Sequence, residues 1–227
     1  NILVTGANGQ LGNEMRLLSL ENAEYNFFFT DVAELDITDE ESVVDYVQQK
    51  SIDCIVNCSA FTAVDKAETS VELCDKLNDH AVGYLAKAIQ LRGGFLVHVS
   101  TDYVFDGTSH VPYVEEDLTC PNTVYGRTKL CGEKSAFANC ENVMVIRTAW
   151  LYGDGKNFVK TMLRLADTHP TLTVVADQIG SPTYTPDLAK LICDMVVTEK
   201  YGTYHGTNEN YCSWCEFAAE IMKMAGK

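Results

Sequence analysis

The sequence lacks any apolar run that approaches the ~18 residues needed to span a bilayer. It is also poor in positive charge, because 17 lysines and arginines stand against 32 aspartates and glutamates, which gives a formal net charge of −15. Such a charge repels nucleic-acid phosphates and anionic lipid surfaces. We therefore expect neither nucleic acid nor a membrane as a partner, and an anionic ligand must be bound locally by backbone N–H groups.

Internal repeats, low-complexity tracts and blocks of like charge are absent as well. A chain of 227 residues fits one large domain, or a large domain with a small lobe. No signal peptide is visible, because the strand-like segment 1–5 opens the sequence. The first residue is not methionine and a helical pattern after Ser213 runs to Lys227, so we expect residues to be missing at both ends.

The nine cysteines are odd in number and scattered through predicted strands and helices, which favours free thiols in a reducing cytoplasm. Cys212 and Cys215 form a C-x-x-C pair without a second pair at zinc spacing, so we interpret them as two thiols at a helix start. The five histidines show no metal-ligand spacing, and no metal site is predicted from them. His98 has apolar neighbours and is interpreted as a core or strand-end residue rather than a base.

Apolar runs of strand length alternate with segments of helical period, which is typical of a parallel sheet built from βαβ units. The predicted strands cover residues 1–5, 25–31, 52–58, 94–100 and 142–148. The predicted helices between them cover residues 10–20, 39–50, 69–92 and 125–138. We therefore predict an α/β fold, a Rossmann-like doubly wound parallel sheet.

The pattern loosens beyond residue 150, where helices are expected near 156–168, near 186–198 and from 213. We expect a dinucleotide-binding Rossmann domain over 1–150 and a mainly substrate-binding lobe over 151–227, incomplete at its C-terminus. One helix start is predicted in detail. Thr38 is expected as the N-cap of the second crossover helix, with Glu41 at the capping-box position.

The first predicted strand runs directly into G-A-N-G-Q-L-G over residues 6–12 and then into a helical pattern. In this context Gly6 can make the tight turn, Gly9 can admit a pyrophosphate, and Gly12 can let the helix pack closely on the strand. The pattern favours a dinucleotide site, and the alternative is a glycine-rich turn needed only for packing.

Asp31 stands at the end of the second predicted strand, where Rossmann proteins commonly place an acid on the adenosine ribose hydroxyls. An acid there repels the extra phosphate of NADP, and no arginine lies beside it. We therefore expect NADH to be preferred over NADPH, although Asp31 could also be an ordinary loop acid.

Tyr125 and Lys129 lie four residues apart at the start of a predicted helix, on one of its faces. A reductase must protonate a carbonyl oxygen as hydride arrives, and a tyrosine with a pKa of about 10 does this poorly without a nearby cation. The fourth strand ends in Ser100 and Thr101, at the sheet edge where ligands bind, so Thr101 can hydrogen-bond a substrate carbonyl. Each of these features alone is common, and together they favour hydride transfer.

Four further blocks make a resemblance specific. The chain resembles the extended short-chain dehydrogenase/reductases and, within them, the dTDP-4-dehydrorhamnose reductase family. The similar blocks are S-T-D-Y-V-F-D-G at 100–107, T-A-V-D-K-A-E at 62–68, R-T-A-W-L-Y-G at 147–153 and D-Q-I-G-S-P-T at 177–183. They occur in family order across nearly the whole chain.

This resemblance implies that Thr101, Tyr125 and Lys129 form the catalytic set and that Tyr125 protonates the 4-keto oxygen of a dTDP-linked 4-keto-6-deoxysugar. Hydride would come from NADH or NADPH. With the cysteine content above, we expect a cytoplasmic enzyme that is a monomer or homodimer. Magnesium at a subunit contact, known among relatives, is the only metal that the resemblance suggests.

The resemblance also implies binding residues. Cofactor contacts are expected from Gly9, Gln10, Leu11, Asp31, Asp36, Ile37, Ala60, Phe61 and Thr62, beside Tyr125 and Lys129. Substrate contacts are expected from Thr101, Asp102, Tyr103 and Trp150. Asn78 is expected to support Lys129 through water. Phe61 departs from the family pattern, which has a histidine there, so ring contacts at this position are expected to differ.

Three alternatives remain open on the sequence. A nucleotide-sugar dehydratase would need a glutamate where this chain has Tyr103. A 4-epimerase shares the tyrosine and lysine but usually has a serine-rich block at the end of the fourth strand. A non-catalytic regulatory homologue would bind nucleotide without turnover, which the intact Thr101, Tyr125 and Lys129 disfavour.

Overall fold

A six-stranded parallel sheet forms the centre of the molecule, in a computed structural model that describes residues 1–227. The strand order is β2-β1-β3-β4-β5-β9, and every pair is parallel. The bounds are Ile2–Thr5 for β1, Phe27–Thr30 for β2, Cys54–Asn57 for β3, Phe95–Thr101 for β4, Val143–Thr148 for β5 and Gly202–His205 for β9. The five predicted strands are confirmed, and β9 was not predicted.

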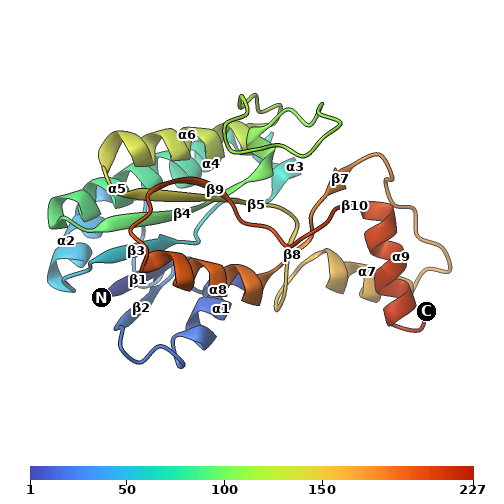
Figure 1. Ribbon diagram of the computed structural model, residues 1–227, viewed down its shortest axis with the longest axis horizontal. Helices are drawn as coiled ribbons and strands as arrows, with labels where there is room; N and C mark the ends of the chain where they lie inside the picture. Colours follow the sequence, from blue (N-terminus) through green and yellow to red (C-terminus); the bar gives the residue numbers. More distant parts are fainter.

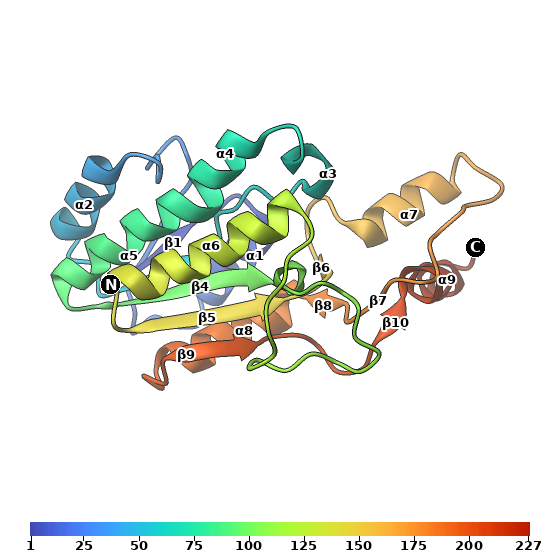
Figure 2. The same cartoon turned by 90° about the horizontal axis from the view of Figure 1, so that it is seen from above.

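Helices cover both faces of this sheet, as Figures 1 and 2 show. One face carries α1 (Gln10–Leu18) and α8 (Thr185–Val196), and the other carries α2 (Glu40–Gln49), α5 (Ala81–Arg92) and α6 (Val124–Asn139). Each face has its own apolar cluster, of 12 and 18 buried residues respectively. Because helices cover both faces, β3 and β5 are buried along their whole length, as expected for parallel strands.

The direction in which successive strands are added reverses between β1 and β3. The chain places β2 on one side of β1, then returns to lay β3, β4 and β5 on the other. In open α/β sheets, ligands bind outside the carboxyl ends of the strands at such a point. The segments that follow β1, β3 and β4 therefore face one crevice.

The predicted start of the second crossover helix is wrong by one residue. Asp39, not Thr38, is the N-cap of α2, because its carboxylate accepts hydrogen bonds from the backbone N–H groups of Glu41 and Ser42. Thr38 instead donates its hydroxyl to Asp36 at 2.6 Å. Both residue types cap helices well, so local sequence did not separate them.

The predicted helix over 69–92 is three consecutive segments, α4 (Val71–Asp75), a π-helical turn η1 (Lys76–His80) and α5. The π turn contains Asn78, which is fully buried. Single π turns inside α-helices often occur at functional sites. A Cβ on Gly132 of α6 would lie 2.0 Å from the Asn78 carbonyl oxygen, so only glycine allows α6 to lie this close.

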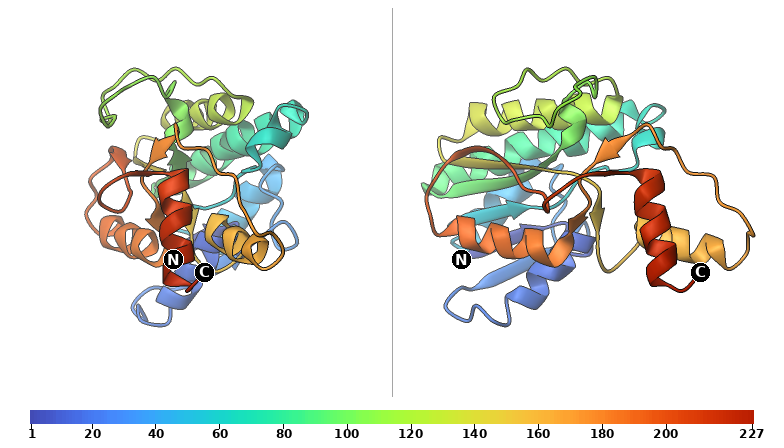
Figure 3. Two further views of the ribbon diagram at one scale, coloured as in Figure 1. Left: turned by 90° about the vertical axis from the view of Figure 1, so that its right-hand side faces the viewer. Right: turned by 45° about the vertical axis from the view of Figure 1, so that its right-hand side comes forward.

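The remaining elements lie beyond the sheet. They are α3 (Val64–Ala67), the 3₁₀ turn η2 (Asp102–Val104), β6 (Leu151–Tyr152), α7 (Phe158–Ala166), β7 (Ile179–Gly180), β8 (Thr183–Tyr184), β10 (Cys212–Ser213) and α9 (Trp214–Met224). Helices α7 and α9 pack together through their own apolar cluster and form a small lobe at one end, seen in Figure 3. The segment assigned above to a lobe from residue 151 is thus divided, because α8 and β9 join the sheet.

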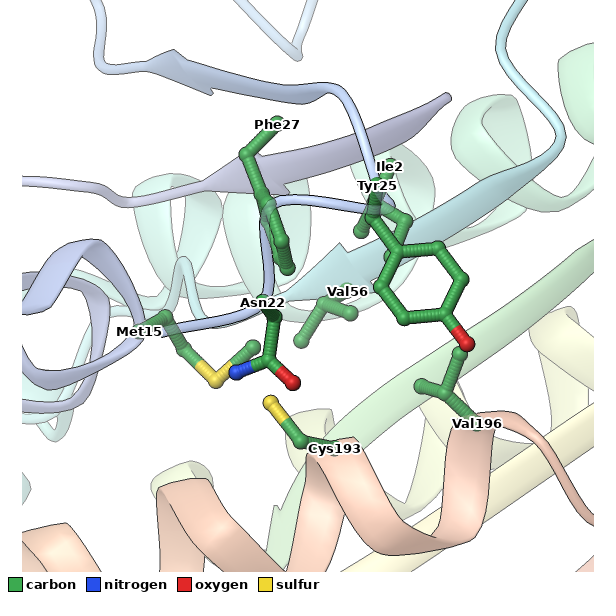
Figure 4. A pocket seen from close by; sticks show the side chains of 8 residues that line it. All are labelled: Ile2, Met15, Asn22, Tyr25, Phe27, Val56, Cys193 and Val196. Carbon is green, nitrogen blue, oxygen red and sulfur yellow. The ribbon is translucent and has the colours of Figure 1, made fainter. Parts of the chain in front are cut away.

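A small apolar pocket lies away from the crevice, between the sheet and α8 (Figure 4). Seven of its eight lining residues are hydrophobic, and they include Ile2 and Phe27, which begin β1 and β2. None of the predicted site residues lines it. None of the helices is both long and apolar enough to cross a membrane.

Candidate active site

The glycine loop after β1 is a tight cradle at the start of α1. Gly6 has φ +64°, and a Cβ on it would lie 2.8 Å from backbone atoms of Ser59. A Cβ on Gly12 would lie 2.4 Å from the Gly6 carbonyl oxygen. Gly9 is the N-cap of α1 and offers no side chain to the first N–H groups of that helix. Those N–H groups and the helix dipole suit a phosphate, so the loop fits a dinucleotide.

Asp31 follows β2 and lies against this loop. One carboxylate oxygen accepts from the Asn8 backbone N–H at 3.1 Å, and the other accepts from Val32 N–H at 2.8 Å. Asp36, farther along, accepts from the hydroxyl and N–H of Thr38, and these bonds lower its pKa. Ile37 is buried beside it. The acid predicted for the ribose is therefore placed at the glycine loop by backbone contacts.

The segment after β3 is fixed by Asn78. The Asn78 side-chain oxygen accepts from Phe61 N–H at 2.8 Å, and its nitrogen donates to the Phe61 carbonyl at 3.2 Å and to Thr128 Oγ1 at 3.1 Å. This two-point contact sets the backbone of the expected cofactor segment, residues 60–62. Asn78 contacts Phe61 and Thr128 directly, and Lys129 is not among its hydrogen-bond partners.

Tyr125 is placed by the first turn of α6. The Thr123 side chain caps this helix by accepting from Gly126 N–H at 3.0 Å. A Cβ on Gly126 would lie 2.1 Å from the Tyr103 carbonyl oxygen, so glycine lets α6 lie directly on η2. The Tyr103 and Tyr125 rings consequently meet edge to face, with centroids 5.5 Å apart.

Thr101, Asp102 and Tyr125 form a connected group at the end of β4. Thr101 donates its hydroxyl to Asp102 Oδ1 at 2.9 Å, and the Tyr125 hydroxyl lies close to Thr101. Burial raises the pKa of Tyr125 above its ordinary value, against a smaller lowering by the neighbouring Thr101 hydroxyl. The phenol therefore carries its proton in the free chain, as a proton donor must.

Lys129 lies one turn farther along α6 and is 1% exposed. Its amine donates to the Val99 carbonyl at 2.7 Å and lies 3.3 Å from His98 Nε2, and no hydrogen bond joins it to Tyr125. Burial lowers the pKa of Lys129 to about 8, although the nearby Glu133 carboxylate acts in the opposite direction. The amine is therefore far easier to deprotonate than a surface lysine.

A buried ion pair supports the same face of α6. Glu133 accepts two hydrogen bonds from Arg147 of β5, at 2.7 and 3.0 Å, and a third from Ser100 Oγ at 2.5 Å. Arg147 also lies over the Phe105 ring, 5.2 Å from its centroid. These contacts join α6, β4 and β5 directly behind Thr101. Neither Glu133 nor Arg147 was predicted to belong to the site.

The side chain of Asp102 is half-buried, and this burial disfavours its ionised form. Burial raises its pKa from 3.8 to about 6, and hydrogen bonds from Thr101 and from backbone N–H groups only partly offset that rise. A folded-state pKa above the unfolded value means that the folded chain favours the protonated acid. The stability that protonated Asp102 contributes is present below pH 4 and is lost as the pH rises through about 6.

Asp102→Asn is therefore expected to stabilise the chain at pH 8, by at most about 3 kcal/mol, because asparagine resembles the protonated acid. At pH 4 the variant and the parent should unfold at nearly the same temperature. Thermal unfolding of both proteins across this pH range measures the difference. A stability difference that does not change with pH would exclude the ionisation of Asp102 as its cause.

Trp150 lies between β5 and β6 and contacts the lobe, outside the group formed by Thr101, Asp102 and Tyr125. Its backbone has φ +46°, and its ring stacks on Trp214 with centroids 3.5 Å apart and planes 11° apart. A Cβ on Gly180 would lie 2.5 Å from the Trp150 ring, so only glycine at this position leaves room for the ring. Trp214 was not predicted, because a lone tryptophan at a helix start carries no functional signal.

Comparison with known proteins identifies the family of this chain. The family described as RmlD substrate binding domain matches residues 1–227. The chain belongs to this family. A curated relative from Aggregatibacter actinomycetemcomitans, named dTDP-4-dehydrorhamnose reductase, is 42% identical over 99% of this chain and 79% of its own length. The expected membership of the dTDP-4-dehydrorhamnose reductase family is thereby confirmed.

Two solved structures of this family closely match the fold. A dTDP-4-dehydrorhamnose reductase from Clostridium acetobutylicum has TM-score 0.97 and 45% identity over 99% of this chain and 80% of its own. One from Bacillus anthracis, in complex with NADP, has TM-score 0.96 and 42% identity at the same coverage. The predicted Rossmann-like fold is confirmed. The chain contains no group of three or more His, Cys, Asp or Glu that could hold a metal ion.

Proposed function

We propose that this chain reduces the 4-keto group of dTDP-4-dehydro-L-rhamnose, a dTDP-linked 4-keto-6-deoxysugar, with NADH or NADPH as hydride donor. The observation that carries the proposal is the meeting of Thr101 and Tyr125 at the carboxyl end of β4, in the crevice that the glycine loop also borders. The family's named reductases support the choice of reaction and substrate.

Several residues of the chain would hold the dinucleotide. The loop over Gly6–Gly12 would take the pyrophosphate at the start of α1, and Asp31 would take the adenosine ribose. The segment at Phe61, clamped by Asn78, borders the same crevice. The bound reduced nicotinamide would supply hydride to the 4-keto carbon. The residues of this chain would supply the proton and stabilise the charge that develops when it leaves.

Tyr125 is proposed to donate the proton to the 4-keto oxygen. Thr101, which lies close to the Tyr125 hydroxyl, would orient the phenol and the carbonyl. The free chain keeps Tyr125 protonated, so loss of that proton during reduction needs a cation to stabilise the phenolate. Lys129 is the amine on the same helix face and is proposed to provide it. Asp102, Tyr103 and Trp150 are proposed to contact the sugar.

We place the chain in the cytoplasm, as a monomer or homodimer. Its nine cysteines are all unpaired, which suits a reducing compartment. The net charge of −15 disfavours nucleic acid as a partner, because it repels the phosphate backbone.

The proposal is tested by following the absorbance of reduced nicotinamide while the chain is mixed with dTDP-4-dehydro-L-rhamnose. We expect consumption of one reduced cofactor per sugar, and none with a UDP-hexose that lacks a 4-keto group. Interconversion of UDP-hexoses without net cofactor consumption would instead identify an epimerase and contradict the proposal. Cofactor binding without turnover of any of these sugars would identify a regulatory homologue.

Asp31→Ala tests the cofactor site. Loss of a charged hydrogen bond to the ribose costs about 1.5–3 kcal/mol, so NADH binding should weaken about tenfold or more. NADPH should be affected less, because the same change removes repulsion of its extra phosphate. Titration calorimetry with both cofactors measures this, and Glu24→Gln serves as a control because it removes an exposed acid that does not contact Asp31. Equal losses for both cofactors would contradict the role of Asp31 in preference.

A further inference from the structure

A row of buried polar side chains leads from β1 to the amine of Lys129. Thr5, Asn57 and His98 have no exposed surface although they stand in apolar strands. Thr5 Oγ1 donates to Asn57 Oδ1 at 2.7 Å, Asn57 Nδ2 lies 3.1 Å from His98 Nδ1, and His98 Nε2 lies 3.3 Å from Lys129 Nζ. Buried polar groups are costly unless they are all paired. The direction of each bond in this row therefore decides which protonation states it allows.

The orientation of Asn57 is fixed by a backbone group. Ser59 N–H donates to one end of the Asn57 amide at 3.0 Å, and a backbone N–H can only donate. That end must be the oxygen, which also accepts the Thr5 hydroxyl. The other end is then the NH₂ group, and it points at His98 Nδ1.

This orientation fixes the tautomer of His98. Because Asn57 donates, His98 Nδ1 must be an unprotonated acceptor, which excludes the doubly protonated imidazolium. A neutral imidazole with an unprotonated Nδ1 carries its proton on Nε2. That N–H points at Lys129 Nζ. An amine can accept it only with a free lone pair, so Lys129 is uncharged in this arrangement, while one of its own N–H groups donates to the Val99 carbonyl.

We propose that His98 is a positioning residue for Lys129: Asn57 sets the His98 tautomer, its Nε2–H holds the uncharged lysine on β4, and proton uptake from solvent releases that lysine toward the cofactor. An ammonium group cannot accept the His98 bond, so charging Lys129 and freeing it are one event. The release step rests on the proposed function, because it needs Lys129 to serve the nicotinamide end of the site. The hydrogen bond that holds the uncharged Lys129 on β4 does not depend on the proposed function.

The groups around Lys129 favour the uncharged held state above about pH 8. Burial lowers the pKa of Lys129 to about 8 and that of His98 well below its ordinary value. Two groups that can carry negative charge face the amine, Glu133 on α6 and the Cys58 thiol after β3. Arg147 already pairs with Glu133. Burial also raises the pKa of Cys58 to about 12, so that thiol stays neutral.

The test uses the cofactor-free chain with nitrogen-15 in its histidines and carbon-13 in its lysines. Nitrogen chemical shifts distinguish the two neutral tautomers, and the His98 signal is assigned by its loss in His98→Phe. We expect His98 as the Nε2–H tautomer between about pH 6 and pH 9. A Nδ1–H tautomer or an imidazolium in this range would overturn the proposal.

The substitution Asn57→Asp should reverse the direction of the hydrogen bonds from residue 57 to His98 and from His98 to Lys129. The new carboxylate has no NH₂ group and can only accept a hydrogen bond from His98 Nδ1. His98 should therefore become the Nδ1–H tautomer, with the lone pair of Nε2 directed at Lys129. The titration midpoint of Lys129 should then rise by about 1 or more. Thr5→Val is the matched control, because it removes a neighbouring bond but leaves the Ser59 N–H that orients Asn57. An unchanged tautomer in folded Asn57→Asp would contradict the proposal.

Should Asn57→Asp fail to fold, His98→Phe gives an independent result. It removes the N–H that favours the uncharged amine while keeping a buried ring, so the Lys129 midpoint should rise. A fall would mean that His98 had been accepting from a charged lysine, which is the opposite arrangement.

Binding of NADH supplies a second readout that does not depend on turnover. Calorimetry in two buffers of different ionisation enthalpy counts the protons taken up on binding. Above about pH 8 we expect proton uptake by the parent chain and reduced uptake by Asn57→Asp. Binding without uptake in the parent would overturn the release step. A chain that shows the Nε2–H tautomer but reduces no keto sugar would retain the held lysine and lose only the proposed function.

Discussion

Replacing Tyr125 by phenylalanine is expected to lower kcat by about 10²–10⁴-fold, the range that a positioned general acid contributes. The change removes one hydroxyl from a buried ring that packs against Tyr103, so the fold should survive. NADH affinity should stay within about threefold, because the glycine loop and Asp31 supply most of that binding. Steady-state kinetics with dTDP-4-dehydro-L-rhamnose and cofactor titration measure the two effects separately.

Tyr113→Phe is the matched control for this experiment. The Tyr113 hydroxyl donates to Asp106 Oδ1 at 2.7 Å in the loop after η2 and contacts none of Thr101, Tyr125 or Lys129. Its removal should leave kcat nearly unchanged. Turnover of Tyr125→Phe equal to that of the control would remove Tyr125 from the reaction.

The second large effect concerns stability. Glu133→Gln should reduce the free energy of unfolding by about 3–5 kcal/mol, because it leaves the buried guanidinium of Arg147 without its counter-charge. Both side chains are less than 10% exposed, so water cannot replace the lost partner. Urea unfolding at neutral pH measures the loss.

A surface pair serves as the comparison. Lys190 and Asp194 lie 2.7 Å apart on α8 with both side chains more than 60% exposed, and Asp194→Asn should change stability little. Replacing Glu133 and Arg147 together by methionine should recover much of the loss, because no unpaired charge remains. A Glu133→Gln variant as stable as Asp194→Asn would mean that the ion pair does not stabilise the fold.

Much of the fold could be predicted because its signals are local. The loop over residues 6–12 sits between β1 and α1, and every part of that prediction lies within a dozen residues. The strand β9 was missed for the opposite reason. Its sequence, G-T-Y-H over Gly202–His205, has no apolar run, and it is a strand only because β5 lies beside it. Its pairing partner is about 60 residues earlier in the chain.

The residues of the candidate site also differ in how far the sequence could predict them. Thr101, Tyr125 and Lys129 could be proposed from spacing and resemblance. His98 was interpreted as a core residue, and it is buried, but its neighbour Asn57 is 41 residues away and Lys129 is 31 away. A pattern along one strand cannot show which polar side chains of other elements will meet it. The protonation of Lys129 follows only from the full set of bond directions.

The central claim is that hydride passes from the nicotinamide to the 4-keto carbon of the sugar while Tyr125 protonates the oxygen. The most direct measurement uses NADH deuterated at the transferred position and examines the product by NMR. We predict one deuterium on the former keto carbon and one equivalent of oxidised cofactor per sugar. A product without deuterium, or a sugar converted while the cofactor stays reduced, would contradict the account.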